Sequence, residues 1–278
     1  MRVYLGGVRG STPAPGPDFV RYGGHTSCVA LAHDDGPPQL ILDAGTGLRR
    51  ITSLMDGEPF RGTILLGHLH WDHVHGLPFF DAGFRTGHRV DVLLPAVDGD
   101  ASSTLARGLS PPHFPISPTE LGHGWAFGDL DEGRFHIEGF DVLVREIPHK
   151  GGRTLGFRVT DGQHTVAYLS DHFPLAAGAG PDGLGAYHEA ALELAGGVNV
   201  LLHDAQFLAS QFPEVAYLGH SAVEYATGLA KAAQARALVL FHHAPDRTDD
   251  ELDVILKAQC DARLPVTAAV EGTYLALP

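Results

Sequence analysis

The sequence has few cysteines and no long apolar run. Its two cysteines, Cys28 and Cys260, stand far apart outside any C-x-x-C pair, which excludes a disulfide framework or a cysteine zinc knuckle. We interpret both as small buried residues. No apolar stretch approaches the ~18 residues of a membrane-spanning helix. The N-terminal residues lack the apolar segment of a signal peptide, so we expect a soluble cytoplasmic protein without a membrane partner.

Positive charge is also scarce. Lys+Arg number 19 against 33 Asp+Glu, and the formal net charge is −14 with histidine neutral. Such a chain lacks the basic surface that neutralises nucleic-acid phosphates or an anionic membrane. Its 44% apolar and 19% charged residues are typical of a folded globular protein. No repeat or linker divides the 278 residues, so we expect one domain over residues 1–278.

Short apolar runs that end at turn residues predict buried strands. The predicted strands lie at 40–42, 63–66, 90–94 and 266–270, and residues 125–169 are strand-like, with hairpin turns at 131–133 and 161–162. Helical patterns cover 185–194, 221–234 and 249–260. The second helix opens on Ser221-Ala-Val-Glu224, a capping-box signature. Strands alternating with helices indicate a layered α/β fold.

Histidine is unusually abundant, with 18 residues, and one segment concentrates it. Directly after the predicted strand at 63–66 the chain reads Gly67-His68-Leu69-His70-Trp71-Asp72-His73. His68 and His70 are two residues apart, so an extended chain points them to the same side. Asp72 and His73 follow on a turn. Imidazole and carboxylate together suit Zn²⁺, Mn²⁺ or iron, so the segment predicts a metal site.

This motif resembles the signature of the metallo-β-lactamase-fold hydrolases, and further segments follow in that family's order. They are Leu42–Gly45, Ile147–His149, Tyr168–Asp171, Leu202–Ala205, Gly219–Ser221 and Leu238–His243. The resemblance covers most of the chain and implies an α/β, four-layer αβ/βα sandwich. It also implies two divalent metal ions, above all Zn²⁺, with Mn²⁺ or Fe²⁺ as alternatives.

The resemblance also implies which residues hold the two ions. The implied ligands are His68, His70 and His149 for one ion, Asp72, His73 and His242 for the other, and Asp171 between them. His243 is the alternative to His242. Asp43 is expected to orient a ligand histidine through its ring N–H, unless it is a plain turn residue. His203 is expected to face away from the ions.

Gly219-His220-Ser221, preceded by Leu202-His203-Asp204, resembles the phosphodiesterase branch that includes ribonuclease Z. The resemblance implies that His220 protonates the leaving alkoxide and that Asp204 orients His220. Asp72 is counted as a catalytic residue as well as a ligand. The alternative for His220 is a surface histidine that caps a turn.

Two features of the sequence narrow the range of expected substrates. Ribonuclease Z inserts a long basic arm for tRNA between the residues that match His149 and Asp171, whereas this chain has a short interval there, so we expect no nucleic-acid partner. The segments Gly6–Pro13 and Tyr22–Cys28 resemble small bacterial phosphodiesterases that act on cyclic phosphates. His25 departs from that group, which tends to carry Asn there, and the cysteine-containing extra zinc site of its phosphonate-pathway member is absent.

The sequence therefore predicts a metal-dependent phosphoric diester hydrolase of a small, cyclic phosphodiester, attacked by hydroxide held between the two ions. Lys150, Arg153 and the Arg9–Thr12 loop are weaker candidates for contacts to the substrate phosphate. One alternative is an acyl hydrolase on the same ions, such as a thioesterase, lactonase or lactamase. Another is a non-catalytic metal- or nucleotide-binding sensor. A homodimer is compatible with the sequence, although no helix indicates an interface.

Overall fold

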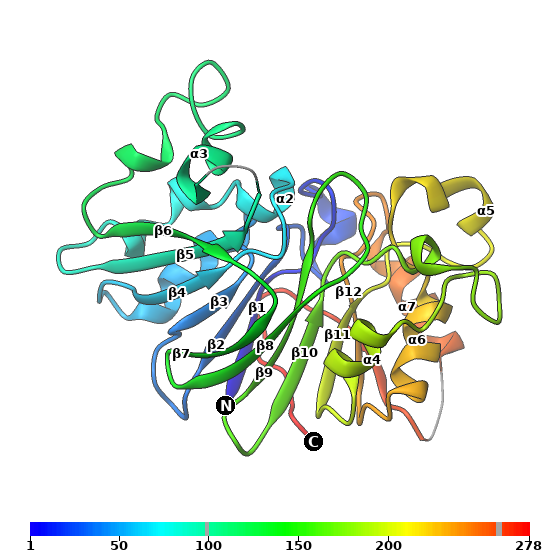
Figure 1. Cartoon of the computed structure of the whole chain (residues 1–278). Helices are drawn as coiled ribbons and strands as arrows, with labels where there is room; N and C mark the ends of the chain where they lie inside the picture. Colours follow the sequence, from blue (N-terminus) through cyan, green and yellow to red (C-terminus); the bar gives the residue numbers. More distant parts are fainter. Residues whose placement is uncertain (98–99, 260–262) are drawn as a thin grey trace.

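Two β-sheets lie at the centre of the computed structural model, and helices cover their outer faces (Figure 1). The structure describes residues 1–97, 100–259 and 263–278. The first sheet has the order β1-β2-β3-β4-β5-β6, and the second has the order β13-β12-β11-β10-β9-β8-β7. Cys28 is a buried free thiol, as expected, whereas Cys260 lies outside the described residues.

Each predicted run contains a strand, whereas the strands Arg2–Gly7 and Cys28–Ala32 were not predicted. The first sheet contains β1 (Arg2–Gly7), β2 (Cys28–Ala32), β3 (Leu40–Leu42), β4 (Arg61–Leu65), β5 (Arg89–Pro95) and β6 (Trp125–Leu130). The second contains β7 (Gly133–Ile137), β8 (Phe140–Glu146), β9 (Leu155–Thr160), β10 (Thr165–Leu169), β11 (Val200–Asp204), β12 (Leu238–Phe241) and β13 (Val266–Ala268).

One predicted hairpin is confirmed and the other is wrong. The turn at 161–162 joins antiparallel β9 and β10. The turn at 131–133 joins no pair, because β6 pairs with β5 in the first sheet and β7 pairs with β8 in the second. This turn therefore carries the chain from one sheet to the other, which local turn chemistry does not reveal.

The helices are short and lie outside the sheets. They are α1 (Leu48–Ile51), α2 (Trp71–Val74), α3 (Ala101–Ala106), α4 (Glu189–Ala195), α5 (Phe212–Val215), α6 (Val223–Ala232) and α7 (Asp249–Ala258). Single 3₁₀ turns are η1 (Pro17–Phe19), η2 (Thr52–Met55), η3 (Leu77–Phe79), η4 (Asp81–Gly83), η5 (Pro118–Glu120), η6 (Pro174–Ala177) and η7 (Ala216–Leu218).

The capping box predicted at Ser221 is wrong. Helix α6 has Ala222 at its N-cap without a side-chain cap. The Ser221 hydroxyl instead donates to the His172 carbonyl (2.7 Å), and Glu224 accepts from the Ala209 N–H (2.8 Å). The predicted helix at 185–194 also begins later, at Glu189, because the His188 side chain caps it.

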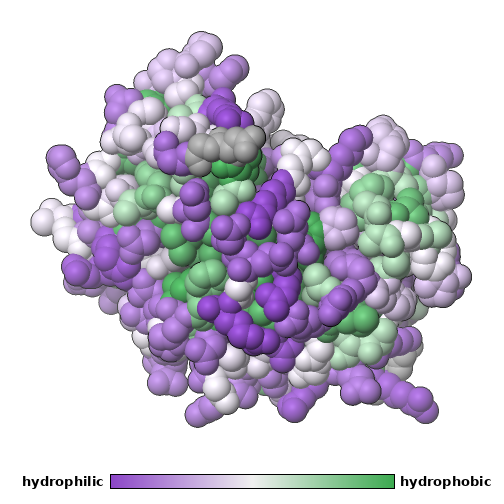
Figure 2. Space-filling view, viewed as in Figure 1, coloured by the Kyte–Doolittle hydropathy of each residue, from purple (hydrophilic) through white to green (hydrophobic). Residues whose placement is uncertain are grey.

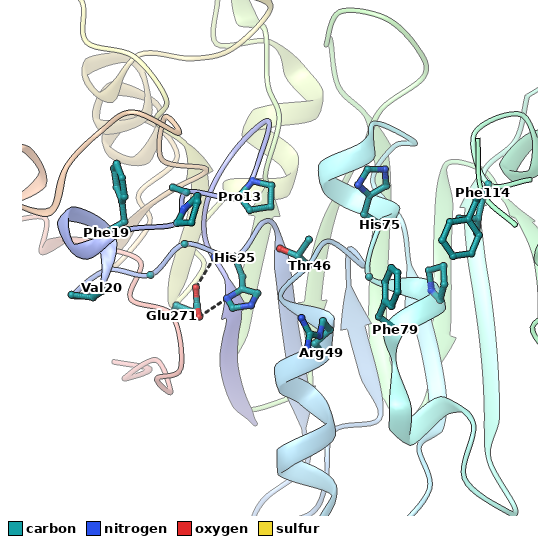
Figure 3. Close-up of a pocket in the computed structure, with 18 of the residues that line it drawn as sticks. Pro13, Phe19, Val20, His25, Thr46, Arg49, His75, Phe79, Phe114 and Glu271 are labelled. Carbon is teal, nitrogen blue, oxygen red and sulfur yellow. Dashed lines mark hydrogen bonds and ion pairs between the residues drawn. The ribbon is translucent and has the colours of Figure 1, made fainter. Parts of the chain in front are cut away.

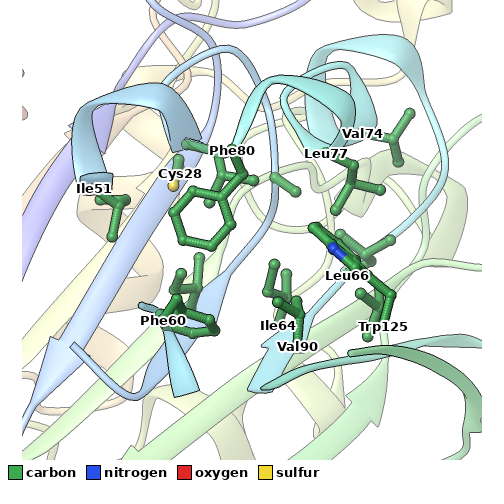
Figure 4. Close-up of a cluster of buried hydrophobic side chains, with 14 of the residues drawn as sticks. Cys28, Ile51, Phe60, Ile64, Leu66, Val74, Leu77, Phe80, Val90 and Trp125 are labelled. Carbon is green, nitrogen blue, oxygen red and sulfur yellow. The ribbon is translucent and has the colours of Figure 1, made fainter. Parts of the chain in front are cut away.

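Three apolar clusters confirm the four-layer αβ/βα sandwich. Between the sheets, residues such as Leu5, Phe157 and Phe241 are fully buried. A second cluster fills the space outside the first sheet, where Phe60 and Phe80 meet edge to face (Figure 4). A third joins the outer face of the second sheet to α4 and α6. The layers therefore alternate helix, sheet, sheet and helix.

Strand direction decides where a site can form. β3 to β6 run parallel in one sheet, and β10 to β13 run parallel in the other. The carboxyl ends of parallel strands meet at one edge of a sheet, which is where open α/β sheets bind their ligands. The segments that follow β4, β8, β10, β11 and β12 carry the residues singled out in the sequence.

Hydrophilic side chains cover most of the face shown in Figure 2, and apolar side chains appear between them in small groups. Among the described residues, no helix combines the length and the apolar character needed to cross a lipid bilayer.

The core between the sheets should dominate stability. Phe157 on β9 is fully buried, so Phe157→Ala leaves a cavity and should lower the free energy of unfolding by about 3–5 kcal/mol. Urea denaturation monitored by circular dichroism measures this loss. Val254→Ala is the control, because Val254 is 65% exposed and should change stability by less than about 0.5 kcal/mol. Equal effects of the two substitutions would contradict the assignment of this core.

Candidate metal centre

The turn after β4 presents the histidine motif at the edge of the first sheet. β4 ends at Leu65, and the Gly67 N–H donates to Asp43 Oδ1 (2.7 Å). The chain then turns into α2, whose N-cap is His70. His68, Asp72 and His73 are buried. The local fold thus places all four motif side chains within one turn and one short helix.

Three histidines form the first group together with Asp171, and their ligand atoms lie within 4.8 Å of one another. His68 Nε2 and His149 Nε2 lie 3.6 Å and 3.5 Å from Asp171 Oδ2. His149 Nε2 is also 3.3 Å from His70 Nδ1. Burial lowers the pKa of His149 to about 4 and also lowers those of His68 and His70. Neutral imidazoles with free nitrogens are the form that binds a metal ion.

The second group lies on the other side of the same carboxylate. His73 Nε2 and His242 Nε2 lie 3.0 Å and 3.2 Å from Asp171 Oδ1. The same two nitrogens lie 3.2 Å and 3.1 Å from Asp72 Oδ2. His243 points elsewhere, because its Nε2 donates to the Ala269 carbonyl (3.0 Å). Geometry therefore favours His242 over His243.

Asp171 faces both groups, one carboxylate oxygen toward each. It is 1% exposed, and neither oxygen has a hydrogen-bond partner among the described residues. His68 Nε2 and His73 Nε2 lack partners too. Burial alone would raise the pKa of Asp171, but His242, His73 and His68 outweigh it and hold this pKa well below its usual range.

A buried carboxylate without donors is costly unless a cation compensates it. Five imidazoles and two carboxylates in two clusters form the donor set of a two-metal site. These residues therefore fit a pair of divalent ions, and the geometry brings together all seven ligands that the family resemblance implied.

Asp43 orients the side chain of His73 in the histidine motif. Its Oδ2 accepts hydrogen bonds from His73 Nδ1 (2.7 Å), the Tyr168 hydroxyl (2.8 Å) and the Ser170 hydroxyl (3.2 Å). Because Nδ1 donates, the lone pair of neutral His73 lies on Nε2, toward Asp72 and Asp171. Asp43 has a φ of 60°, in the left-handed region that Asp tolerates better than most residues.

A backbone carbonyl orients the ring of His149. The Gly219 carbonyl accepts from His149 Nδ1 (2.7 Å), so neutral His149 presents Nε2 to the cluster. Gly219 has a φ of 93°, and a Cβ there would lie 2.5 Å from the Lys150 Cβ. Nothing in the sequence motif signals this contact, because it joins two loops that meet only in the fold.

His220, the residue after Gly219, is paired with the carboxylate of Asp204. His220 Nδ1 donates to Asp204 Oδ2 (2.9 Å), and the His220 ring stacks on that of His242 (centroids 4.9 Å apart). Burial opposes a charge on His220, but the carboxylates of Asp204, Asp171 and Asp72 outweigh it and raise its pKa. His220 is 7% exposed, which argues against a surface histidine that caps a turn.

A chain of three histidines, two buried and one half-buried, contacts Asp204. A carbonyl only accepts, so His203 donates from Nδ1 to the Asp204 carbonyl (2.7 Å) and accepts at Nε2 from His172 Nδ1 (2.9 Å). His172 Nε2 in turn lies 2.7 Å from His188 Nε2. The His172 backbone N–H donates to Asp204 Oδ2 (3.0 Å). His203 thus faces away from the clusters, as expected, while the role of His172 was missed.

A cavity of about 430 Å³ opens over both clusters. Its lining comprises Ser11, Leu69, His70, Trp71, Asp72, His149, Asp171, Gln206, Leu218 and His220. Ser11, which the sequence did not single out individually, donates its backbone N–H to Asp72 Oδ2 (2.7 Å). Trp71 is 68% exposed at the rim. The space accommodates a small substrate in contact with both clusters and with His220.

The three weaker candidates for contacts to the substrate phosphate bind other groups of the protein. Arg9 is fully buried and donates to the carbonyls of Gly23, Ala244 and Arg247. Lys150 donates to the Tyr217 carbonyl (2.7 Å). The Arg153 guanidinium contacts Asp131 and Glu146. Arg9 is therefore a structural residue that ties the N-terminal loop to the C-terminal part of the chain.

Asp43→Asn should weaken metal binding. Asn places an NH₂ group where Asp43 accepts several hydrogen bonds, so His73 loses its fixed orientation, and affinity for Zn²⁺ should fall by about 10- to 100-fold. Competition with a chromophoric chelator measures the affinity. Asp56→Asn, which removes one exposed carboxylate, is the control. Equal Zn²⁺ affinities of Asp43→Asn and the wild type would refute this role.

The histidine chain should make stability depend on pH. Burial lowers the pKa of His203 from 6.5 to about 4, so between these values the unfolded chain binds a proton that the folded chain excludes. The free energy of unfolding should therefore fall as the pH falls through this window, by up to about 1.4 kcal/mol per pH unit from this group. Urea denaturation with a chelator present should show a smaller slope for His203→Gln. An unchanged slope would argue against His203 as its source.

Three comparisons place this geometry among known proteins. Residues 39–243 match the model of the "Beta-lactamase superfamily domain" family. Ribonuclease BN of Salmonella typhimurium is 28% identical over 280 residues, which cover 85% of this chain and 88% of that protein.

Solved structures share the fold. The metallo-β-lactamase-fold protein YhfI of Bacillus subtilis superposes with a TM-score of 0.73 at 19% identity, over 99% of each chain. A diphosphatase of the PhnP family superposes with a TM-score of 0.70 at 17% identity, over 100% of this chain and 98% of that one. The matched family model covers the strand ends that carry both clusters. The chain therefore belongs to the beta-lactamase superfamily and is a hydrolase of the metallo-β-lactamase fold.

Proposed function

We propose that the chain is one hydrolase domain over residues 1–278 that cleaves a small, cyclic phosphodiester at a two-metal centre. The observation that carries the proposal is the hydrogen bond between His220 and the buried Asp204 (2.9 Å), because His220 lines the same cavity as Asp72 and Asp171. Phosphodiester hydrolysis expels an alkoxide that needs a proton, and His220 is placed to supply it. Acyl hydrolysis at the same centre has no need of this pair.

His68, His70, His149 and Asp171 would hold one divalent ion, and Asp72, His73, His242 and Asp171 would hold the other. When bound, two ions, most readily Zn²⁺ with Mn²⁺ or Fe²⁺ as alternatives, supply Lewis acidity and lower the pKa of water. Asp204 accepts a hydrogen bond from His220 Nδ1–H and so fixes the ring, and Nε2–H of the protonated imidazole delivers its proton to the departing oxygen. Asp204 and the other carboxylates favour the protonated imidazole before transfer.

Two features support a small substrate over RNA. The cavity of about 430 Å³ is the size of a pocket for a small molecule. The net charge of −14 disfavours a polyanionic partner, and the weak phosphate candidates are engaged by protein groups. The likeness to ribonuclease BN makes precursor tRNA the substrate against which this proposal is to be tested.

The proposal is tested by a hydrolysis screen. Chelator-treated protein is reloaded with Zn²⁺, Mn²⁺ or Fe²⁺ and offered cyclic nucleotides, phosphoribosyl cyclic phosphate, a linear diester, precursor tRNA, a thioester and a lactone. We expect metal-dependent turnover with the cyclic phosphates above all. Faster turnover of the thioester or lactone would favour an acyl hydrolase. Metal binding without any turnover would favour a sensor, and cleavage of precursor tRNA would favour a nuclease.

His220→Ala should lower kcat on a cyclic nucleotide by about 10²- to 10⁴-fold, because the alkoxide leaves unprotonated. Turnover of bis(p-nitrophenyl) phosphate should fall much less, since p-nitrophenolate is a stable anion. Metal content should stay at the wild-type value. His123→Ala, which removes an exposed histidine, serves as the control. Equal losses on both substrates would show that His220 is no general acid.

A further inference from the structure

A second cavity, of about 780 Å³, lies apart from the metal centre and shares no lining residue with the cavity over the two clusters. Its walls come from the N-terminal loop at 13–25, the segment 46–49, the segment 75–79, the segment 108–114 and Glu271. It borders the C-terminal end of α2, where the C-cap residue His75 lines it. None of the steps proposed for hydrolysis uses this cavity.

Aromatic and proline side chains form its walls. Phe19 and Pro13 line one side, and Phe79 and Phe114 line the other (Figure 3). The Phe79 and Phe114 rings meet edge to face with centroids 6.0 Å apart, and Phe79 is 56% exposed to the open space. Such walls favour a flat aromatic body, which stacks on ring faces and buries apolar area.

A cation without a partner lies between these walls. In the part of the chain that the structure describes, Arg49 makes no hydrogen bond or ion pair, although acidic residues outnumber basic ones by 33 to 19. His25 lines the same cavity (Figure 3). The Glu271 carboxylate accepts from the His25 backbone N–H and from Nδ1, both at 2.8 Å. This contact fixes the ring and leaves Nε2 open to a ligand.

We propose that this cavity is a binding site for a small aromatic anion, a ring system that carries a carboxylate, sulfonate or phosphate group. The aromatic walls would contact the ring, and the Arg49 guanidinium would pair with the anionic group. His25 Nε2 would offer a second polar contact, which gives a role to the residue that departs from the cyclic-phosphate group. The volume is that of a pocket for a ligand of nucleotide size. This inference does not depend on the proposed hydrolysis.

A matched pair of fluorescent probes tests the proposal on the full chain. Anilinonaphthalene sulfonate carries an aromatic body with an anionic group, and N-phenylnaphthylamine has the same aromatic body without the charge. We expect the sulfonate to bind more tightly. Arg49→Gln should weaken sulfonate binding by about fivefold and leave the neutral probe unaffected. Phe79→Ser should weaken both probes.

Two control variants remove a guanidinium group and a phenyl ring from positions outside the cavity. Arg236→Gln and Phe135→Ser alter exposed residues that do not line the cavity, and both should bind the probes like the wild type. Circular dichroism and metal content establish that each variant folds. Equal affinity of the wild type for both probes, or the same loss in Arg49→Gln and Arg236→Gln, would overturn the proposal.

A second copy of the chain is the competing occupant. In that case sedimentation would show a dimer that Phe79→Ser dissociates, and neither probe would bind the wild-type dimer. This result would also overturn the proposal.

Discussion

The carboxylate of Asp171 is the constraint on which the site depends. It is almost completely buried, lies at the end of β10, and turns one oxygen toward each of two histidine groups. A buried anion without hydrogen-bond donors is tolerated only where positive charge compensates it. Without bound ions, the positive field must come from neighbouring histidines. With two ions, both oxygens would gain a partner. This requirement explains why so many titratable groups converge where strand ends of the two sheets meet.

Contacts around the ligands make that convergence possible. Asp43 accepts hydrogen bonds from His73, Tyr168 and Ser170, so it links the first sheet to the end of β10 in the second sheet and also orients His73. The Gly219 carbonyl orients His149, and the next residue, His220, bonds to Asp204. The loop at Gly219 therefore positions both His149, a candidate metal ligand, and His220, the proposed acid.

The molecule separates its polar and apolar cavities. The cavity over the clusters is lined by imidazole and carboxylate side chains, among them His220, whereas the larger cavity at the end of α2 is lined by aromatic and proline residues together with Arg49. Helix α2 and its C-cap reach both cavities, because Asp72 lines the first and His75 lines the second. A short helix thus contributes to two chemically different surfaces.

Much of the fold could be predicted because its signals are local. Apolar runs closed by glycine or proline identified β3, β4 and β5, and the family segments in their order led to the four-layer sandwich, which the structure confirms. Local signals failed where the tertiary structure decides. The turn at 131–133 changes sheets, and Ser221 leaves its expected cap to bond the His172 carbonyl. In both places a distant partner outweighs the local preference.

The sequence by itself determined the chemistry available to this protein: a histidine motif after a buried strand, aspartates at later strand ends, and a negative net charge. Spacing along the chain carries that information, because ligand type and strand ends are local properties. Only the tertiary structure decided that His242 rather than His243 faces Asp171, that Arg9 is buried, and that Gly219 orients His149. These outcomes depend on segments that meet only when both sheets are assembled, so no local pattern encodes them.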